Sequence, residues 1–538
     1  MSTKINKIIS GTGLMALAYF ISRFLGLLRE MVIADKFGAK GITDVYNASF
    51  TIPDFLNYML AGGAFSIVLI PMISKYLSDT KPPQITKRGQ EIFSAILTPV
   101  VLMVILLTVV IFFLTPWFTA LAFPAFRKDP VKFAMTVRLT RIILPAQIFF
   151  IVGGLINATL RARGDFRGNA WGPNIYNLFI ILGGVVLGGF IGIEGLSIGV
   201  LVGAFLGPFF MCYWWARHSI QYTLSFDFKS ADLREYIRLH LPLMVGISLL
   251  TVDQLFIRIF GGKAGIAEGT ITCLNYSRTI MLVPIALVGQ ATGQVSLTYL
   301  SQLWQQGNTE EFSRTLNQTI RGVMYLAFIF TGAIFLLAHP TTTILFFHGA
   351  FTLKNNHVTT MLLQIMIFAV PAFAGLQIIV NGYYARKNTL RPMIISSIST
   401  AFVGLIYYMA TITMGGPGIA LATAVGFWLA FGVMLFDYNH KYGRHEGFML
   451  QSFLLTAFKA LVASGVGILL SLLVFTYSGL CHFNPDKRSH AILLMGLVGV
   501  FYTSVVFSMS LLMGGEDARI LKELVGKIWR KVKRFFNS

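Results

Sequence analysis

Long apolar runs are the feature of this chain that most restricts its fold. About fourteen runs of roughly 20 residues follow one another along the sequence, and this is the length that an α-helix needs to cross the hydrocarbon core of a bilayer. Charged residues make up only 12% of the chain, well below the roughly 25% of soluble domains. The sequence therefore predicts an all-α polytopic membrane protein with about 14 transmembrane helices. The expected spans are residues 8–28, 45–70, 92–121, 138–158, 170–190, 193–215, 237–260, 272–298, 320–338, 359–380, 392–413, 417–438, 454–476 and 490–512.

The distribution of basic residues predicts the orientation of these helices. If the N-terminus is cytoplasmic, most of the 43 Lys and Arg residues fall in loops and tails that face the cytoplasm. Positive residues concentrate on that side of membrane proteins, so both termini are expected to be cytoplasmic. Topology and anionic lipid headgroups then account for the net charge of +21, and no nucleic-acid partner is expected.

The chain contains a weak internal repeat. Residues 33–44 (IADKFGAKGITD) resemble residues 256–269, and residues 144–164 resemble residues 370–388 at nearly the same separation. Six spans per copy is an even number, so both copies cross the bilayer in the same direction, which is a layout used by alternating-access transporters. The expected parts are an N-terminal lobe at 1–216, a C-terminal lobe at 217–446, two additional spans at 447–513 and a basic amphipathic helix at 514–538.

Glycines recur every four residues through much of the fifth and sixth expected spans. This spacing lets two membrane helices approach closely, so we expect the two spans to pack tightly. The glycines are Gly184, Gly188, Gly192, Gly195, Gly199, Gly203 and Gly207.

Charged residues in and beside the first span are the strongest functional signal. Arg23, Arg29 and Glu30 lie there. An arginine at the centre of a membrane helix costs roughly 2.5–3.5 kcal/mol, so such residues usually face a cavity and serve a function. The repeat aligns Glu30 with Asp253, and the eighth span adds Arg278.

If the first two spans of both lobes face each other, these charges converge on a cleft with an excess of positive charge. Several arginines suit a tetrahedral anion, and a diphosphate matches the guanidinium fork. Two alternatives remain: the arginines extend to lipid headgroups, or they pair with the neighbouring carboxylates. The candidate residues are Arg23, Arg29, Arg258, Arg278, Glu30, Asp44 and Asp253.

The sequence lacks the signatures of enzymes and of metal sites. It has no HExxH, no Walker A loop and no paired aspartates of the kind that hold Mg²⁺. His339, His348 and His357 lie in expected loops without the spacing of metal ligands. We therefore expect a transporter and not an enzyme, with no cofactor other than a coupling ion of unknown identity. Asp253 and Asn381 are the candidate ligands of that ion.

Three segments resemble a known family. The segment SRFLGLLREMVIADKFGAKGITD and its continuation to residue 71 are similar to the opening of the MurJ/MviN lipid II flippases. VDQLFIRIFGG with LNYSRTIMLVPIALVGQATG, and FHGAFT with NGYYARKNTLRPM, are similar to later parts of that family. The resemblance implies two six-helix lobes of the multidrug/oligosaccharidyl-lipid/polysaccharide exporter group. It also implies transfer of undecaprenyl-diphosphate-linked peptidoglycan precursor from the cytoplasmic to the outer leaflet of the bacterial inner membrane, by alternating access through an arginine-lined cavity.

The resemblance further implies roles for single residues. The cationic positions of the family fall on Arg23 and Arg29, and its acidic positions fall on Glu30 and Asp44. The two additional spans are associated with a groove for the lipid tail. The implied partners are lipid II, membrane lipids and proteins of cell-wall synthesis.

The chain also departs from the family pattern. Asn57 and Tyr58 stand where many members carry two arginines, and Arg278 is displaced by one residue. Arg258 is the candidate to replace a missing cation. Two other functions remain open at this point. A cation-coupled drug or polysaccharide-lipid exporter would favour carboxylates and aromatic residues in the cleft, and a non-transporting scaffold of the cell-wall machinery would tolerate the loss of Arg23 and Arg29.

Overall fold

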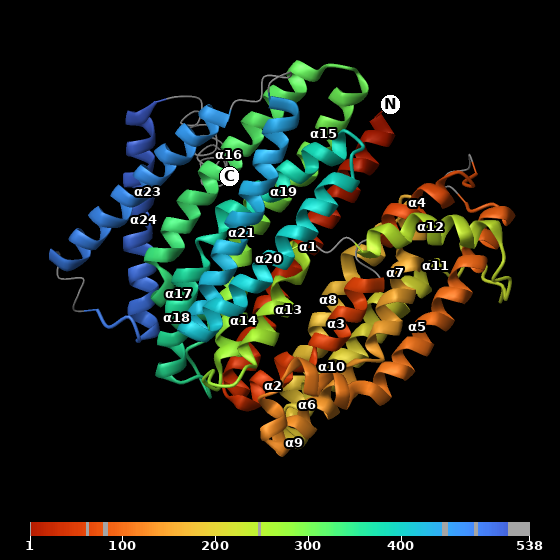
Figure 1. Ribbon diagram of the computed structural model, residues 1–538, viewed down its shortest axis with the longest axis horizontal. Coiled ribbons are helices and arrows are strands. Elements are labelled where there is room, and N and C mark those ends of the chain that lie inside the picture. Colours follow the sequence, from red (N-terminus) through yellow and green to blue (C-terminus); the bar gives the residue numbers. More distant parts are fainter. Residues whose placement is uncertain are drawn as a thin grey trace. The chain divides into compact units, whose positions relative to one another are not determined.

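The computed structural model describes residues 2–60, 64–78, 84–245, 249–443, 450–477 and 483–514. Helices dominate these ranges, which also hold one isolated β-bridge between Leu77 and Ile85 (Figure 1). The predicted basic helix at 514–538 lies outside the described residues, except for Gly514. Residue contacts divide the chain into two compact units. The first unit comprises Met1–Gly246, Ile257–Thr272 and Gly349–Phe351, and the second comprises Ile247–Phe256, Cys273–His348 and Thr352–Ser538.

The α-helices that lie wholly in the first unit all precede residue 246. They are α1 (Ser2–Phe37), α2 (Gly41–Ser49), α3 (Thr51–Leu60), α4 (Ala64–Ser74), α5 (Lys87–Ala122), α6 (Pro130–Ile143), α7 (Ala146–Ala162), α8 (Arg167–Leu182), α9 (Gly188–Ile191), α10 (Glu194–Ala204), α11 (Cys212–Ala216) and α12 (Ala231–Val245).

Two further helices, α13 (Leu249–Gly261) and α14 (Thr270–Pro284), each contribute residues to both units. The remaining helices belong to the second unit. They are α15 (Ala291–Gln305), α16 (Thr309–Leu336), α17 (Ala338–Leu345), α18 (Leu353–Met366), α19 (Ala369–Ala385), α20 (Leu390–Met414), α21 (Gly416–Tyr438), α23 (Leu450–Tyr477) and α24 (Arg488–Met513).

Ten helices of the described chain are long and apolar enough to cross a membrane. The pair α18 and α19, bent by 43° at a short break, brings the number to 11 if it forms one span. These helices correspond to expected spans. The other three expected spans, at 8–28, 45–70 and 237–260, each include residues or side chains outside the described part of the chain.

The expected span at 45–70 is divided into shorter helices. α2 ends at Ser49 and α3 begins at Thr51. Pro53 lies in the first turn of α3, where its missing N–H removes no helical hydrogen bond. The prediction of a span over residues 45–70 did not include this break, because an apolar run does not reveal where a helix breaks.

The internal repeat is visible in the secondary structure. α6 and α18 both have 14 residues, and α7 and α19 both have 17. A residue with left-handed backbone follows each of the two 17-residue helices. It is Gly164 (φ 80°) after α7 and Lys387 (φ 61°) after α19. These two pairs of helices therefore share their lengths and the turn that follows the second helix, in segments that the sequence repeat aligns.

Glycines bring α8 and α10 into close contact. A Cβ atom added to Gly199 would lie 2.6 Å from the carbonyl oxygen of Phe179, and one added to Gly203 would lie 2.8 Å from that of Tyr176. Real Cβ atoms do not approach backbone this closely, so the packing role predicted for these two glycines is confirmed.

We expect Gly199→Ala to destabilise the protein by about 1–3 kcal/mol, the usual cost of overpacking. The added methyl group would push α8 and α10 apart. The measurement is the thermal unfolding temperature in detergent, and Gly189→Ala is the control because its Cβ would meet no atom within 4 Å. Equal unfolding temperatures for the two variants would contradict the packing role.

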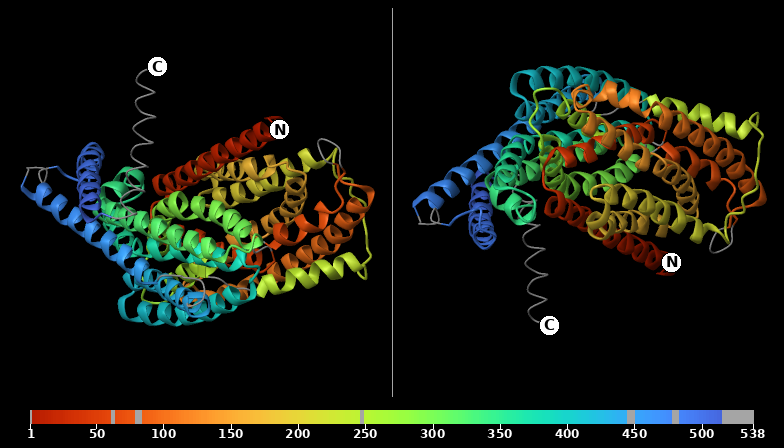
Figure 2. Two further views of the ribbon diagram at one scale, coloured as in Figure 1. Left: turned by 90° about the horizontal axis from the view of Figure 1, so that it is seen from above. Right: turned by 90° about the horizontal axis from the view of Figure 1, so that it is seen from below.

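The last two helices are attached to the second unit through α16. α23 packs along α16, and α24 lies beside α23 and against α17 (Figures 1 and 2). Tyr502 of α24 is fully buried and donates a hydrogen bond to the carbonyl oxygen of Ile329 (3.0 Å), and Ala463 of α23 is buried in the same cluster. A hydrogen bond from Tyr325 to Ser510 (2.5 Å) adds a polar link between α16 and α24.

Candidate functional site

Arg29 connects α1 to α8. Its Nη1 donates to Asn177 Oδ1 (3.2 Å), and its Nη2 pairs with Glu30 Oε1 (2.5 Å). The Arg29 side chain is 27% exposed and that of Glu30 only 5%. Asn177 in turn donates to the carbonyl oxygen of Ser22 (3.5 Å). Protein groups therefore hold the Arg29 guanidinium in place. A side chain that only extended to the lipid headgroups would need no such contacts.

Arg258 is a further candidate arginine of the first unit. It lies near the end of α13, and its Nη1 pairs with Asp54 Oδ2 of α3 (2.6 Å). The Arg258 side chain is 7% exposed, and its guanidinium carbon lies 5.6 Å from the centre of the Phe50 ring. This residue is thus a buried cation held by one carboxylate and one aromatic ring.

An aromatic cluster lies beside both arginines. The Phe50 ring, 5.6 Å from the Arg258 guanidinium carbon, lies 5.1 Å from the ring of Tyr46 in α2. Both rings pack in one core cluster with Tyr176 of α8, the residue before the Asn177 that binds Arg29. We give the name arginine cluster to Arg29, Glu30, Tyr46, Asp54, Tyr176 and Arg258.

In the second unit, Asp253 of α13 joins four helices. Its Oδ2 accepts a hydrogen bond from Arg278 Nε of α14 (2.9 Å), and its Oδ1 accepts one from the Tyr407 hydroxyl of α20 (2.7 Å). The Tyr407 oxygen also lies 2.7 Å from Thr423 Oγ1 of α21. Asp253 is fully buried, so these bonds offset the cost of desolvating its charge.

Protein groups contact both proposed ion ligands. Arg278 and Tyr407 donate to the two oxygens of Asp253, and the amide nitrogen of Asn381 donates to the carbonyl oxygen of Gly293 (2.8 Å). The role of these residues in ion coupling stays a prediction, and so does the convergence of all candidate charges on one cleft.

Three of the predicted arginines are each paired with a carboxylate. In this conformation these arginines therefore form internal ion pairs, which was one of the two alternatives to a free anion-binding cleft. A guanidinium has five N–H donors, so an anionic substrate can bind beside the carboxylate or replace it. If the anion replaces the carboxylate, each buried arginine still has a partner. A buried arginine without a partner would be the costly outcome. The pairs are Arg29–Glu30, Arg258–Asp54 and Arg278–Asp253.

Asp44 secures the start of α14. Its Oδ2 accepts from the Gly269 N–H (2.6 Å), and its Oδ1 accepts from both the N–H (2.9 Å) and the hydroxyl (2.7 Å) of Thr272. Asn47 adds a bond to the same hydroxyl (3.2 Å). A carboxylate at a helix N-terminus also benefits from the helix dipole. The contacts give Asp44 a positioning role, and its predicted contact with substrate is untested.

We expect Asp44→Ala to lower the free energy of unfolding by about 1–3 kcal/mol, because buried donors at the start of α14 lose their acceptor. Thermal unfolding of the purified protein measures this. Asp129→Ala is a matched control, since Asp129 caps α6 through the N–H groups of Val131 and Lys132 but its side chain is 43% exposed. A smaller effect at position 44 than at position 129 would contradict the positioning role.

Sequence reasoning missed several residues of these networks, among them Asp54, Asn177 and Tyr407. Asp54 is a carboxylate within an apolar run, and the rule that singled out Arg29 would also have found it. Asn177 and Tyr407 carry no such signal, since polar uncharged residues are common in membrane helices. Arg23, the remaining candidate, is exposed on α1.

The fold is that of a class of membrane transporters. A solved structure described as the inward-facing conformation of a multidrug resistance MATE family transporter of the MOP superfamily matches with a TM-score of 0.64, over 78% of this chain and 94% of that one, at 14% identity. A structure described as lipid II flippase MurJ in an inward closed conformation matches with a TM-score of 0.74, over 92% of this chain and 99% of that one, at 22% identity.

The family described as lipid II flippase MurJ matches residues 33–484, and the chain belongs to this family. A relative from Rhizobium tropici, named a probable lipid II flippase MurJ, is 26% identical over 526 residues, which cover 95% of this chain and 94% of the relative. A relative of the same name from Vibrio cholerae is 26% identical over 428 residues, which cover 77% of this chain and 79% of the relative. The protein is accordingly a multi-pass membrane flippase of peptidoglycan synthesis, and not an enzyme.

Proposed function

We propose that the chain carries lipid II from the cytoplasmic to the outer leaflet by alternating access, and that the arginine cluster holds the diphosphate during transfer. The observation that supports this role is the position of Arg29 and Arg258 beside one aromatic cluster of the first unit, where each is held by a carboxylate. Two forked cations in one region match the several oxygens of a diphosphate.

The energetics of transfer explain why arginines are needed. An unpaired charge moved from water into hydrocarbon costs tens of kcal/mol in the idealised limit. Guanidinium groups that replace water around the phosphates lower this barrier, while the polyprenyl tail remains in the bilayer. Glu30 and Asp54 keep the two arginines paired when no phosphate is bound. In this scheme the diphosphate exchanges with those carboxylates.

The proposal includes a bacterial inner-membrane location with both termini in the cytoplasm. Two ion pairs support the predicted alternation of spans. Arg88 pairs with Asp232 (2.8 Å), and both lie in regions expected on the inner side. Arg138 pairs with Glu194 (2.8 Å), and both lie where the outer side is expected. Proteins of cell-wall synthesis are proposed as further partners.

Complementation tests the function directly. A strain depleted of its own flippase would express this chain, and lipid II in the outer leaflet would be quantified. We expect growth and outer-leaflet lipid II to return together. A chain that is expressed and inserted, but restores neither, would contradict the proposal. Restored growth without outer-leaflet lipid II would contradict the transport role.

A further inference from the structure

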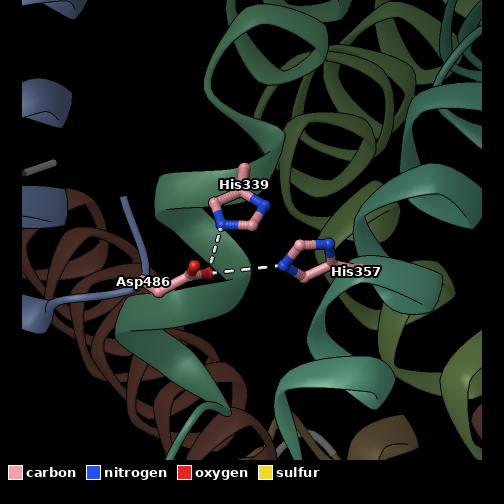
Figure 3. Close-up of side chains that lie close together, drawn as sticks. All are labelled: His339, His357 and Asp486. Atoms are coloured by element: carbon pink, nitrogen blue, oxygen red, sulfur yellow. Dashed lines mark hydrogen bonds and ion pairs between the residues drawn. The ribbon is translucent and has the colours of Figure 1, made fainter. Parts of the chain in front are cut away.

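Two histidines and an aspartate meet in the second unit, outside the networks described above. His339 lies in the first turn of α17, His357 lies in α18, and Asp486 lies just before α24 (Figure 3). Asp486 Oδ1 is 2.8 Å from His339 Nε2 and 3.6 Å from His357 Nε2. One ligand atom from each residue lies within 4.8 Å of the other two.

We propose that His339, His357 and Asp486 bind a divalent transition-metal ion, with Zn²⁺ as the preferred ion. Imidazole nitrogen and carboxylate oxygen are common zinc ligands, with bonds of about 2.0–2.2 Å in tetrahedral geometry. Neighbouring ligand atoms are then roughly 3.3 Å apart, so the observed spacing requires only small side-chain adjustments. Three protein ligands leave the fourth position to water. Mg²⁺ and Ca²⁺ favour all-oxygen sites and suit this set poorly.

The surroundings orient the ligands and leave them accessible. Both imidazole rings direct Nε2 toward Asp486, and the rings stand nearly perpendicular, at 85° (Figure 3). Nδ1 of His339 lies 3.5 Å from the Thr360 hydroxyl, which is 2.7 Å from that of Thr342. Contacts of this kind fix the orientation of a metal-binding imidazole. The side chains are 22%, 58% and 26% exposed for His339, His357 and Asp486, so an ion can reach them.

The position of the site indicates what the ion does. Its ligands come from α17, α18 and the connection that precedes α24, so a bound ion would fasten the last helix pair to the rest of the second unit. In the proposed orientation all three residues lie on the outer side of the membrane. The inference rests on the geometry of the cluster and does not depend on the identity of the lipid substrate.

Zinc binding to the full-length, tag-free protein tests the inference. The protein in detergent would be stripped with a chelator and titrated with Zn²⁺ in competition with a chromophoric chelator. We expect one equivalent to bind, and His357→Ala to weaken binding by at least about tenfold. His357 is mostly exposed, so this variant should fold. His218→Ala is the matched control, because His218 is an exposed histidine of the first unit.

The thermal unfolding temperature provides a second readout. Zn²⁺ is expected to raise it in the wild type and in His218→Ala, because a ligand that binds the folded state stabilises that state. It should have no such effect on His357→Ala or Asp486→Asn. Equal zinc affinity in the wild type and His357→Ala would overturn the proposal. So would the absence of zinc binding to the wild type at micromolar concentrations.

Discussion

Arg29→Ala is expected to reduce outer-leaflet lipid II by about 10- to 100-fold, since hydrogen bonds to charged groups contribute roughly 1.5–3 kcal/mol. In the proposed mechanism this side chain binds the diphosphate as it leaves water, and alanine offers no donor. The measurement is the amount of lipid II in the outer leaflet of a flippase-depleted strain that expresses each variant at equal level. Arg167→Ala serves as the control, because Arg167 forms an exposed pair with Asp165 and such pairs contribute little.

Loss of Arg29 also leaves the buried Glu30 carboxylate without this partner, which by itself can destabilise the fold. The double variant Arg29→Ala/Glu30→Gln removes both charges. We expect it to unfold at a higher temperature than Arg29→Ala and to remain inactive. A double variant that regains transport would show that Arg29 serves only to pair with Glu30. A fully active Arg29→Ala would contradict the proposed role and favour the scaffold alternative.

Arg258→Ala is expected to abolish complementation and to reduce outer-leaflet lipid II about as much as Arg29→Ala does. The side chain is almost fully buried, and the variant removes the second cation of the arginine cluster. The measurements are again growth of the depleted strain and the amount of lipid II in the outer leaflet. Normal growth with a well-expressed Arg258→Ala would rule out the replacement of a missing family cation by this residue.

Asp54 separates a binding role of Arg258 from a structural one. If Arg258 only stabilises the fold through the ion pair, the double variant Arg258→Ala/Asp54→Asn should recover activity, since no unpaired charge remains. If Arg258 binds phosphate, the double variant stays inactive although it folds. In that case Asp54→Asn alone retains the cation and should still bind lipid II. We expect the second pattern.

The sequence was sufficient for those features that depend on local composition. Helices such as α5 and α16 follow from the length and polarity of single runs, and the matched lengths of α7 and α19 follow from repeated segments. Arg29 was identified because charge is costly in an apolar segment. The break between α2 and α3 was not predicted, because it arises within an otherwise apolar stretch.

The partners of these charges could not be predicted, because they come from distant parts of the chain. Arg258 and Asp54 are 204 residues apart, and Arg29 and Asn177 are 148 apart. The histidines were dismissed as metal ligands for the same reason. His339 and Asp486 are 147 residues apart, and no spacing rule connects them. Folding places these groups together. From the sequence, only the repeat pointed to a second charged position far along the chain, because it aligns Glu30 with Asp253.

Equilibrium binding of lipid II to the purified protein tests the central claim most directly. Wild type and Arg29→Ala/Glu30→Gln would be titrated with lipid II and, as a control, with undecaprenol, which has the tail but no phosphate. We predict that the wild type binds lipid II at least about tenfold more tightly than the double variant does, and that this difference disappears with undecaprenol. Equal affinity of both proteins for lipid II would show that the arginine cluster does not hold the diphosphate, and would contradict the account.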